Sequence, residues 1–180
     1  MTDAAASGAP ARHPSVARVL QAATERGLRI EIRQFPEGTR TAEDAARAVG
    51  CSVGQIVKSL VFVADASPIL VLVSGADRAD PDRIAEALAH GASATPRPTI
   101  RRATADEARA ATGFSIGGIP PLGHERPIPV LVDEGLLRNE VVWAAAGLPD
   151  AVFSAPPAEL ARASGARVVA VAVRADPSGS

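Results

Sequence analysis

Two hydrophobic periodicities follow each other at the start of the chain. Through residues 15–26 apolar positions recur every three to four residues, which predicts an amphipathic helix that stops at Gly27. Apolar and charged residues then alternate through 28–35, the pattern of a half-buried strand. Thr41 is placed to cap a second short helix and Gly50 to end it. The chain is therefore expected to begin as helix, strand, helix.

The middle of the chain holds two nearly continuous apolar runs, 56–63 and 68–75, joined by a short polar turn. Neighbouring β-branched runs of this kind predict a hairpin near the middle of a sheet. Later helices are expected over 80–91, with Asp80 as cap and Gly91 as stop, over 104–113, which begins with a Thr104–Glu107 capping box, and over 156–165. Later strands are expected over part of 92–104 and over 128–135, 141–144, 151–155 and 166–173. Helices and strands interleave irregularly, so we expect an α/β fold of mixed α+β type with a mixed sheet and outer helices.

Length and composition indicate a single domain. The chain has 180 residues, 47% of them hydrophobic, which suffices for one buried core and is short for two domains. Residues 1–12 have nothing to pack and are expected to be disordered, as is the tail 176–180, so the folded domain is predicted to span 13–175.

Charge and hydropathy narrow the class of partner. The formal net charge of −1 argues against a protein that coats nucleic acid by electrostatics alone. A basic cluster of Arg97, Arg101 and Arg102 is either solvated surface or a phosphate contact. No apolar run reaches the ~18 residues of a membrane span, and the start lacks the apolar core of a secretory signal. We expect a cytoplasmic protein with no membrane partner.

The residue pattern gives no support to metal or nucleotide chemistry. A single cysteine, Cys51, and three scattered histidines, His13, His90 and His124, lack the spacing of a zinc site. No glycine-rich phosphate-binding signature occurs in a strand-to-helix context. We expect no metal and no cofactor.

One short motif formally matches a hydrolase. Residues 113–117, GFSIG, have the nucleophile-elbow pattern with Ser115 as the nucleophile. An elbow needs a strand before the serine and a helix after it, whereas here a helix is predicted before it and prolines follow. We therefore interpret Ser115 as structural.

The stretch 54–65 contains the single lysine of the chain, Lys58, and every other basic residue among the 19 is an arginine. A charge is costly to bury in such an apolar run, so a lysine kept there is a candidate for chemistry. The alternative is a strand-edge lysine whose stem covers apolar neighbours while its ammonium group stays in water. Position alone leaves both interpretations open.

Residues 114–127 cannot form regular structure because three glycines and three prolines fall within fourteen residues. Gly117 and Gly118 leave peptide groups accessible to a ligand, while Pro120 and Pro121 stiffen the segment. Such a loop can point N–H groups toward a carbonyl oxygen, or it can be an ordinary rigid turn.

Five stretches in this order resemble the bacterial aminoacyl-tRNA deacylases typified by YbaK, which are related to the editing domain inserted in prolyl-tRNA synthetases. They are GQIVKSLVF, SGADRADPDRIAEAL, GFSIGGIPPLGH, D-x-x-L at Asp133–Leu136 and PAELARASGARVV. The likeness covers roughly residues 14–173, almost the whole chain. It implies a mixed, barrel-like central sheet flanked by helices.

The resemblance implies hydrolysis of the ester that joins a wrong amino acid to the 3′ end of a tRNA. The expected substrate is a small amino acid, Ala, Cys, Ser or Thr, on tRNA(Pro). The expected partners are the acceptor end of the aminoacyl-tRNA and an aminoacyl-tRNA synthetase. The alternative is a non-catalytic module of the same fold that holds a tRNA end or a synthetase.

The resemblance also assigns site residues. The strand lysine of the family matches Lys58, and its G-x-x-x-P loop matches residues 117–121. An aminoacyl ester is already activated, so a site needs only to place water and stabilise the oxyanion, and the family uses the 2′-hydroxyl of the terminal adenosine. The expected catalytic groups are Lys58, Gly117 and Gly118. The expected substrate-binding groups are Thr39, Thr41, Ser59, Ile119, Pro120, Pro121 and His124. Further candidates for the pocket lining are Phe62, Ile116 and Leu122.

Overall fold

The computed structural model describes residues 13–90 and 96–174. The disorder predicted for residues 1–12 and 176–180 and the helix stop predicted at Gly91 lie outside the described residues. The domain limits of 13–175 stay a prediction.

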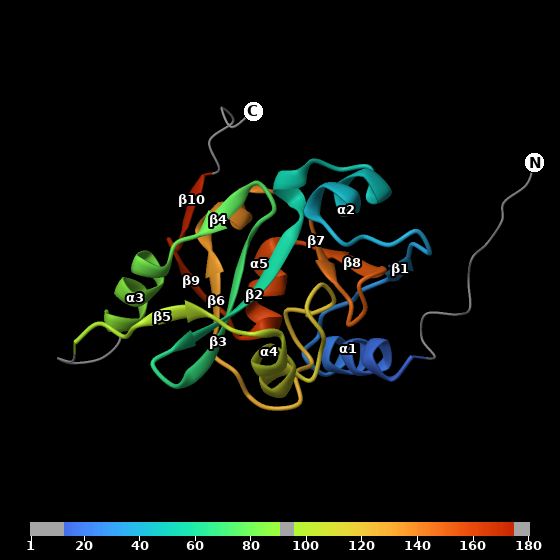
Figure 1. Ribbon diagram of the computed structural model, residues 1–180. Helices are drawn as coiled ribbons and strands as arrows, with labels where there is room; N and C mark the ends of the chain where they lie inside the picture. Colours follow the sequence, from blue (N-terminus) through green and yellow to red (C-terminus); the bar gives the residue numbers. More distant parts are fainter. Residues whose placement is uncertain (1–12, 91–95, 175–180) are drawn as a thin grey trace, which may run out of the picture.

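The described residues form short helices and strands that alternate irregularly along the chain (Figure 1). The helices are α1 (Pro14–Glu25), α2 (Ala42–Val49), α3 (Pro81–Ala89), α4 (Ala105–Thr112) and α5 (Pro157–Ser164), with 3-10 turns η2 (Val53–Gln55) and η3 (Glu134–Arg138). The strands are β1 (Ile32–Gln34), β2 (Val57–Ala64), β3 (Ser67–Ser74), β4 (Asp77–Ala79), β5 (Ile100–Arg102), β6 (Val130–Asp133), β7 (Val142–Ala145), β8 (Ala151–Ala155), β9 (Arg167–Val169) and β10 (Ala172–Arg174).

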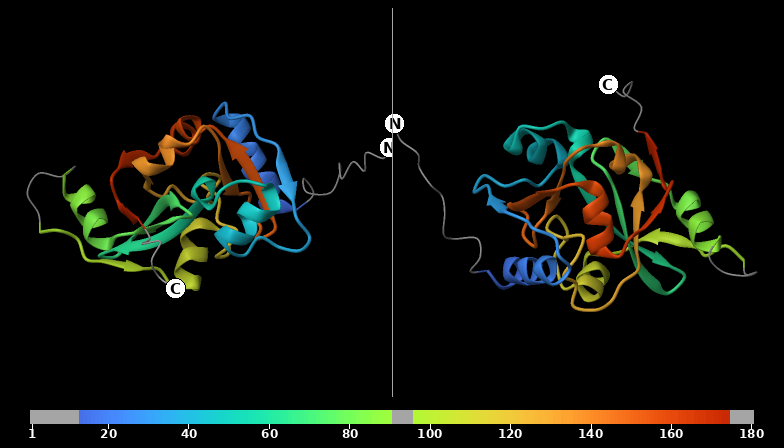
Figure 2. Two further views of the ribbon diagram at one scale, coloured as in Figure 1. Left: turned by 90° about the horizontal axis from the view of Figure 1, so that it is seen from above. Right: turned by 180° about the vertical axis from the view of Figure 1, so that it is seen from behind.

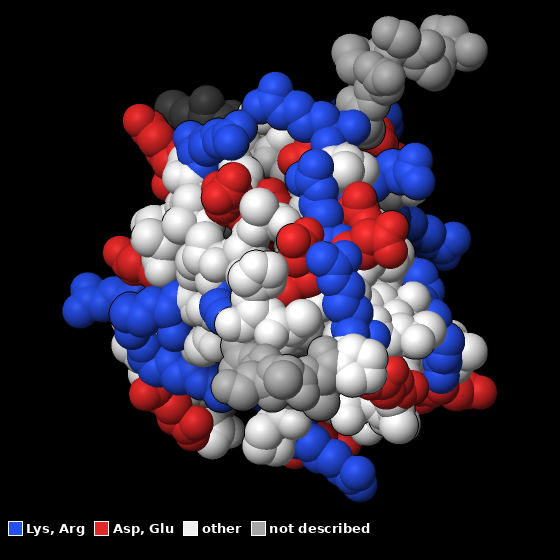
Figure 3. Space-filling view, turned by 90° about the vertical axis from the view of Figure 1, so that its left-hand side faces the viewer, with Lys and Arg blue, Asp and Glu red and all other residues white. Residues whose placement is uncertain are grey.

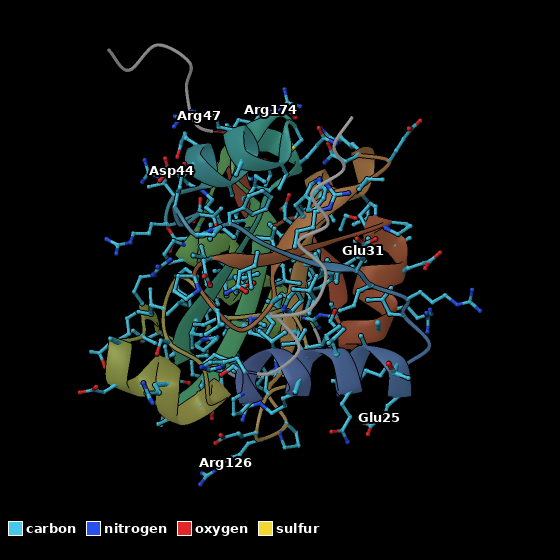
Figure 4. The ribbon with its side chains drawn as sticks, turned by 90° about the vertical axis from the view of Figure 1, so that its right-hand side faces the viewer. Glu25, Glu31, Asp44, Arg47, Arg126 and Arg174 are labelled. Atoms are coloured by element: carbon cyan, nitrogen blue, oxygen red, sulfur yellow. The ribbon has the colours of Figure 1, made fainter. Side chains whose placement is uncertain are left out.

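Two predicted helix starts are confirmed at the level of individual hydrogen bonds. The Thr41 hydroxyl accepts from the Asp44 N–H at 3.0 Å at the start of α2. Thr104 and Glu107 cap α4 with reciprocal bonds between side chain and backbone. Figure 4 shows Asp44 and Arg47 projecting outward from α2, where they form a salt bridge at 3.5 Å. The outer face of α2 is therefore polar, and its small buried residues face inward.

The strands lie in three separate sheets, with orders β5-β2-β3-β6-β9, β1-β8-β7 and β10-β4. The five-stranded sheet is mixed, since β2 is antiparallel to β3 and β5 whereas β6 is parallel to β3 and β9. The predicted mixed sheet with flanking helices is confirmed. The predicted barrel-like closure is not confirmed, because β7 meets the start of β2 only through a single bridge, Ile56–Trp143, and no sheet of the described residues closes on itself.

The predicted central hairpin is confirmed. β2 and β3 pair along their whole lengths, from Val57 opposite Ser74 to Ala64 opposite Ser67. The tight turn between them places Asp65 at φ 55°, a left-handed conformation that aspartate tolerates better than most residues.

Both faces of β3 are buried, so the hairpin lies at the centre of the molecule. Leu70 and Leu72 belong to the larger core, which α1, α4 and α5 complete on one side. Val71 and Val73 point to the other side, where Ile84 of α3 packs. Figures 1 and 2 show α3 and α5 on different sides of the central strands. A strand buried on both faces reads as a continuous apolar run, which is how β3 appears in the sequence.

The predicted closing strand, 166–173, is wrong in one respect. It divides into β9, which extends the central sheet beside β6, and β10, which crosses over to pair with β4. The buried Asp133 carboxylate stabilises the crossing, because its Oδ2 accepts the N–H groups of Val171 and Ala172, both at 2.8 Å. The first strand is also shorter than predicted, 32–34 instead of 28–35.

No helix in the ranges 13–90 and 96–174 is long and apolar enough to cross a membrane. On the face shown in Figure 3, which carries α3 and β5, basic and acidic side chains are interspersed. This mixture agrees with the net charge of −1, and the basic side chains on that face gather in separate groups with acidic side chains beside them (Figure 3).

Candidate active site

A cavity of about 300 Å³ lies beside the first half of β2. Its walls come from β2, from the segment that leads into α2, from the loop around residue 117, and from β7 and β8. Much of the lining is apolar and includes Val57, Val61, Ala108, Ile119 and Val152. A small apolar cavity with a few polar groups is typical of a ligand site.

The cavity occupies a gap in the edge of β2. β5 pairs only with Phe62–Ala64, and β7 meets the chain at the Ile56–Trp143 bridge before β2 begins. Between these two contacts, residues 58–60 have β3 as their only ladder partner among the described residues. The backbone of this segment is therefore free on the side that faces the cavity.

Lys58 lines the cavity, and its ammonium group donates a hydrogen bond to the backbone carbonyl oxygen of Asp77 in β4. Burial lowers the pKa of Lys58 from its usual 10.5. The negative charges of Asp77 and Glu43 oppose this shift, whereas the positive charges of Arg102 and Arg78 add to it. The lysine is thus half-buried and held, not extended freely into water. It can offer its remaining N–H donors to a ligand in the cavity.

Two arginines join Lys58 in the cavity lining, Arg40 and Arg102. Arg102 lies over the Phe62 ring, 5.2 Å from its centre, whereas neighbouring Arg101 is bound to Glu107 at 2.7 Å. Within residues 13–90 and 96–174, Arg40 and Arg102 take part in no ion pair. The described lining residues include no Asp, Glu or His, so the cavity is cationic.

The glycine loop reaches the cavity with Gly117 and Ile119, and not with Gly118. Gly117 has φ +92°, a left-handed conformation that favours glycine. The Gly118 N–H is already bonded to the Ser115 carbonyl oxygen at 3.0 Å. A Cβ on Gly118 would lie 2.8 Å from the carbonyl carbon of Leu148, so this glycine allows two loops to pack closely.

The second half of the loop supports the site from behind. Pro120 and Pro121 are buried and lie outside the cavity lining, as does His124. His124 Nε2 lies 2.8 Å from the Pro120 carbonyl oxygen, and its ring meets Phe114 edge to face with centroids 6.3 Å apart. Burial lowers the pKa of His124 from 6.5, which favours a neutral ring that donates to Pro120.

The two predicted threonines and Ser59 also line the cavity. The Thr39 hydroxyl donates to the Pro149 carbonyl oxygen at 2.6 Å, and the Thr41 hydroxyl caps α2. Of the other lining candidates, Ile116 is at the cavity, whereas Phe62 and Leu122 are buried in the two cores.

Sequence reasoning missed many of the lining residues, among them Arg40, Trp143 and Val152. Arg40 stands between two predicted threonines, which was a usable signal. Trp143 and Val152 gave no such signal in the sequence, because only the folding of the chain brings β7 and β8 close to β2.

Comparison with known proteins decides the family. The family model for the aminoacyl-tRNA editing domain matches residues 36–163. The chain belongs to the aminoacyl-tRNA editing domain family. Within the matched range lie Lys58 and the loop 117–121, while β9 and β10 follow it.

Relatives of this editing-domain protein include free-standing chains and parts of synthetases. A Bacillus subtilis protein designated YwhH is 28% identical over 138 residues, which cover 77% of this chain and 83% of the relative. A proline–tRNA ligase of Acidithiobacillus ferrooxidans is 31% identical over 116 residues, 64% of this chain. The match covers 19% of that ligase, so the chain spans about a fifth of its length.

Among solved structures, the fold is similar to that of a proposed trans-editing enzyme for prolyl-tRNA synthetase. The TM-score is 0.80 at 43% sequence identity, over 91% of this chain and 99% of the other. The fold predicted from the resemblance, apart from barrel closure, is thus that of the editing-domain relatives.

Proposed function

We propose that this editing-domain protein is a trans-editing hydrolase that removes a wrongly attached small amino acid from the 3′ end of tRNA(Pro). The observation that carries the proposal is that Lys58 and Gly117, one from each of two motifs sixty residues apart, line the same cavity. The similarity to a proposed trans-editing enzyme and to proline–tRNA ligases supports the choice of tRNA.

The size and lining of the cavity favour a small amino acid. Its volume of about 300 Å³ is at the lower end for ligand sites. Apolar side chains from β2, α4 and β8 form much of its wall. A side chain such as that of Ala, Cys, Ser or Thr fits such a space better than a large or charged one, because burying a charge there would be costly.

The cationic groups favour the acceptor end of a tRNA as the other part of the substrate. Lys58, Arg40 and Arg102 line the cavity, and both arginines are exposed. Arginine pairs readily with phosphate oxygens through two parallel hydrogen bonds. With a net charge of −1 for the whole chain, we infer that phosphate contacts are few and concentrated around this cavity.

In the proposed reaction, water adds to the ester carbonyl carbon, and the bond from that carbon to the ribose oxygen breaks. The products are the free amino acid and the free 3′ hydroxyl of the tRNA. Lys58 and the Gly117 N–H, which makes no backbone hydrogen bond among the described residues, are the donors we assign to the developing oxyanion. Gly118 positions the loop, because its N–H is engaged by Ser115.

The lining residues that the structure describes offer no carboxylate or imidazole as a general base. We therefore assign the activation of water to the 2′-hydroxyl of the terminal adenosine, which the substrate itself brings. An ester needs less activation than an amide, so this arrangement is chemically sufficient.

The test is a deacylation assay with purified protein. A tRNA(Pro) transcript is charged separately with labelled Ala, Cys, Ser, Thr and Pro, and loss of ester is followed against a buffer blank. We expect hydrolysis of at least one small mischarged pair and no hydrolysis of Pro-tRNA(Pro). Binding of the acceptor end without faster ester loss for any pair would contradict the enzyme and favour a non-catalytic module.

A further inference from the structure

One hydroxyl in the cavity wall has no hydrogen-bond partner. Among the described residues, two buried side-chain polar atoms lack any partner, Arg18 Nε and Ser59 Oγ. Arg18 uses its other nitrogens on Glu125 and Gly113. Ser59 has no other polar side-chain atom, so its hydroxyl is unsatisfied as it stands. A buried hydroxyl without a partner is unfavourable, and such a group calls for an explanation.

The other hydroxyls that line the cavity are already in use. Thr39 donates to the Pro149 carbonyl oxygen, and Thr41 accepts from the Asp44 N–H. Of the described lining residues that carry a hydroxyl, Ser59 alone lacks a bond. It is therefore the lining hydroxyl that has no hydrogen bond to give up when a ligand binds, although its oxygen is buried.

The backbone of Ser59 is free on the same edge. Ile56 and Val61 fix which way the peptide groups of β2 point: the Ile56 carbonyl accepts from Gly75 on the β3 side, and the Val61 carbonyl accepts from Ala103 on the β5 side. Because successive peptide groups alternate, the N–H and C=O of Ser59 point away from β3, like those of Val61. No strand of the described chain pairs with Ser59 there.

The surroundings indicate which part of the substrate meets Ser59. Its side chain shares a face of β2 with Val57 and Val61, the face of the larger core, whereas Lys58 points to the opposite face. An ammonium or phosphate group would be costly to desolvate on this apolar side. An uncharged polar side chain would satisfy the hydroxyl without that cost.

We propose that Ser59 recognises a hydroxyl on the side chain of the aminoacyl group, so that seryl and threonyl esters are preferred over alanyl esters. The inference rests on the proposed deacylase function. A rotation about the single side-chain torsion of Ser59 brings its oxygen toward the cavity that its residue already lines, and the free backbone C=O supplies a second acceptor. An alanyl methyl group in this place leaves the Ser59 hydroxyl unsatisfied, which disfavours that substrate.

The experiment compares one tRNA(Pro) transcript charged with serine or with alanine, two side chains that differ by a hydroxyl. For the wild-type protein we expect kcat/KM to favour the seryl ester by about tenfold or more. Ser59→Ala should reduce hydrolysis of the seryl ester by about the same factor and leave the alanyl ester little changed. Ser59→Thr, which keeps the hydroxyl, should keep the preference.

Ser164→Ala serves as the matched control, because the Ser164 hydroxyl is bonded within α5 to the Ala161 carbonyl oxygen and lies outside the cavity. An active wild-type protein whose seryl-to-alanyl ratio is unchanged by Ser59→Ala would overturn this inference alone. An equal loss on both esters would also overturn it, since Ser59 would then contact a group common to all substrates. Failure of the wild-type protein on every ester would overturn the deacylase function and this inference with it.

Discussion

The ammonium group of Lys58 is bound by the backbone carbonyl oxygen of Asp77, so the acceptor that holds the lysine is main chain and not a carboxylate. A main-chain acceptor neutralises no charge. The charges of Asp77 and Glu43 favour the ammonium form of Lys58, but burial outweighs them and lowers its pKa. A substrate that brings negative charge, in a phosphate or a developing oxyanion, would stabilise it.

Replacing Lys58 tests this directly. Lys58→Met keeps an unbranched apolar stem and removes the charge, and we expect kcat/KM to fall by about 10²–10³. The unfolding midpoint should change little, because the residue lies at the cavity and not in either core. Asp77→Asn preserves the backbone carbonyl but removes a carboxylate charge that favours the ammonium form of Lys58, so we expect it to lose less activity than Lys58→Met. Full activity of Lys58→Met would refute the assignment.

The two adjacent glycines should fail in different ways. Gly118→Ala forces a Cβ against the Leu148 backbone, and we expect a loss of about 1–3 kcal/mol in the free energy of unfolding together with lost activity. Gly117→Ala meets no atom closer than 3.9 Å and carries only the strain of its positive φ, about 1 kcal/mol. Its larger effect should be on kcat. Urea unfolding and deacylation rates, measured on the same preparations, distinguish the two.

Gly54→Ala is the control for both glycine variants, because its Cβ would have 3.8 Å of clearance and its φ is ordinary. Equal stability of the Gly118→Ala and Gly54→Ala proteins would show that the contact with Leu148 is not the reason for the glycine.

Two neighbouring arginines offer a matched pair for the phosphate contacts. Arg102→Gln removes a cation that lines the cavity, and we expect a higher KM for aminoacyl-tRNA. In a plot of the logarithm of affinity against the logarithm of salt concentration, the slope should be shallower by about one. Arg101→Gln removes a cation bound to Glu107 and should leave KM nearly unchanged. With a phosphate-free substrate, an aminoacyl-adenosine, both variants should resemble the wild type. Equal effects of the two substitutions on KM would contradict the phosphate contact.

His124 should make stability depend on pH. Its pKa is lowered by burial, so the folded state binds a proton less readily than the unfolded state. The stabilisation is fully present above the unfolded pKa of 6.5 and is lost as the pH falls toward the lower, folded pKa. His124→Gln should remove this dependence while costing about 1 kcal/mol near pH 7.5 through the contact with Pro120. The urea unfolding midpoints of the wild type and of His124→Gln, at about pH 7.5 and about pH 5.5, measure this dependence. An equal loss of stability in both proteins at the lower pH would contradict the role of His124.

Local signals predicted much of this fold because they are made by neighbours in sequence. The Thr104–Glu107 capping box, the Thr41 cap and the hairpin of β2 and β3 each depend on residues a few positions apart. The fate of residues 166–173 did not follow from the pattern, since the division into β9 and β10 depends on Asp133, more than thirty residues earlier.

The sequence also pointed to two residues of the candidate site. Lys58 and Gly117 carry compositional signals, a lone lysine and a proline-bounded glycine pair, and the fold brings both to one cavity. The distinction between Gly117 and Gly118 was not visible in the sequence, because it depends on Leu148 from a distant loop. The burial of His124 behind Pro120 is likewise a tertiary effect.

The pairing of β10 with β4 bears on the order in which the protein is made. Asp77, which holds Lys58, pairs in β4 with Arg174, near the end of the described chain and beyond the family-matched range. A nascent chain on the ribosome can assemble the β2–β3 hairpin and part of the core before β10 has been synthesised. The carbonyl oxygen of Asp77, which accepts from Lys58, would then lie in a strand that is not yet paired with β10. In the proposed deacylase, competence to cleave an ester would then be acquired only after β10 has been synthesised and has paired with β4.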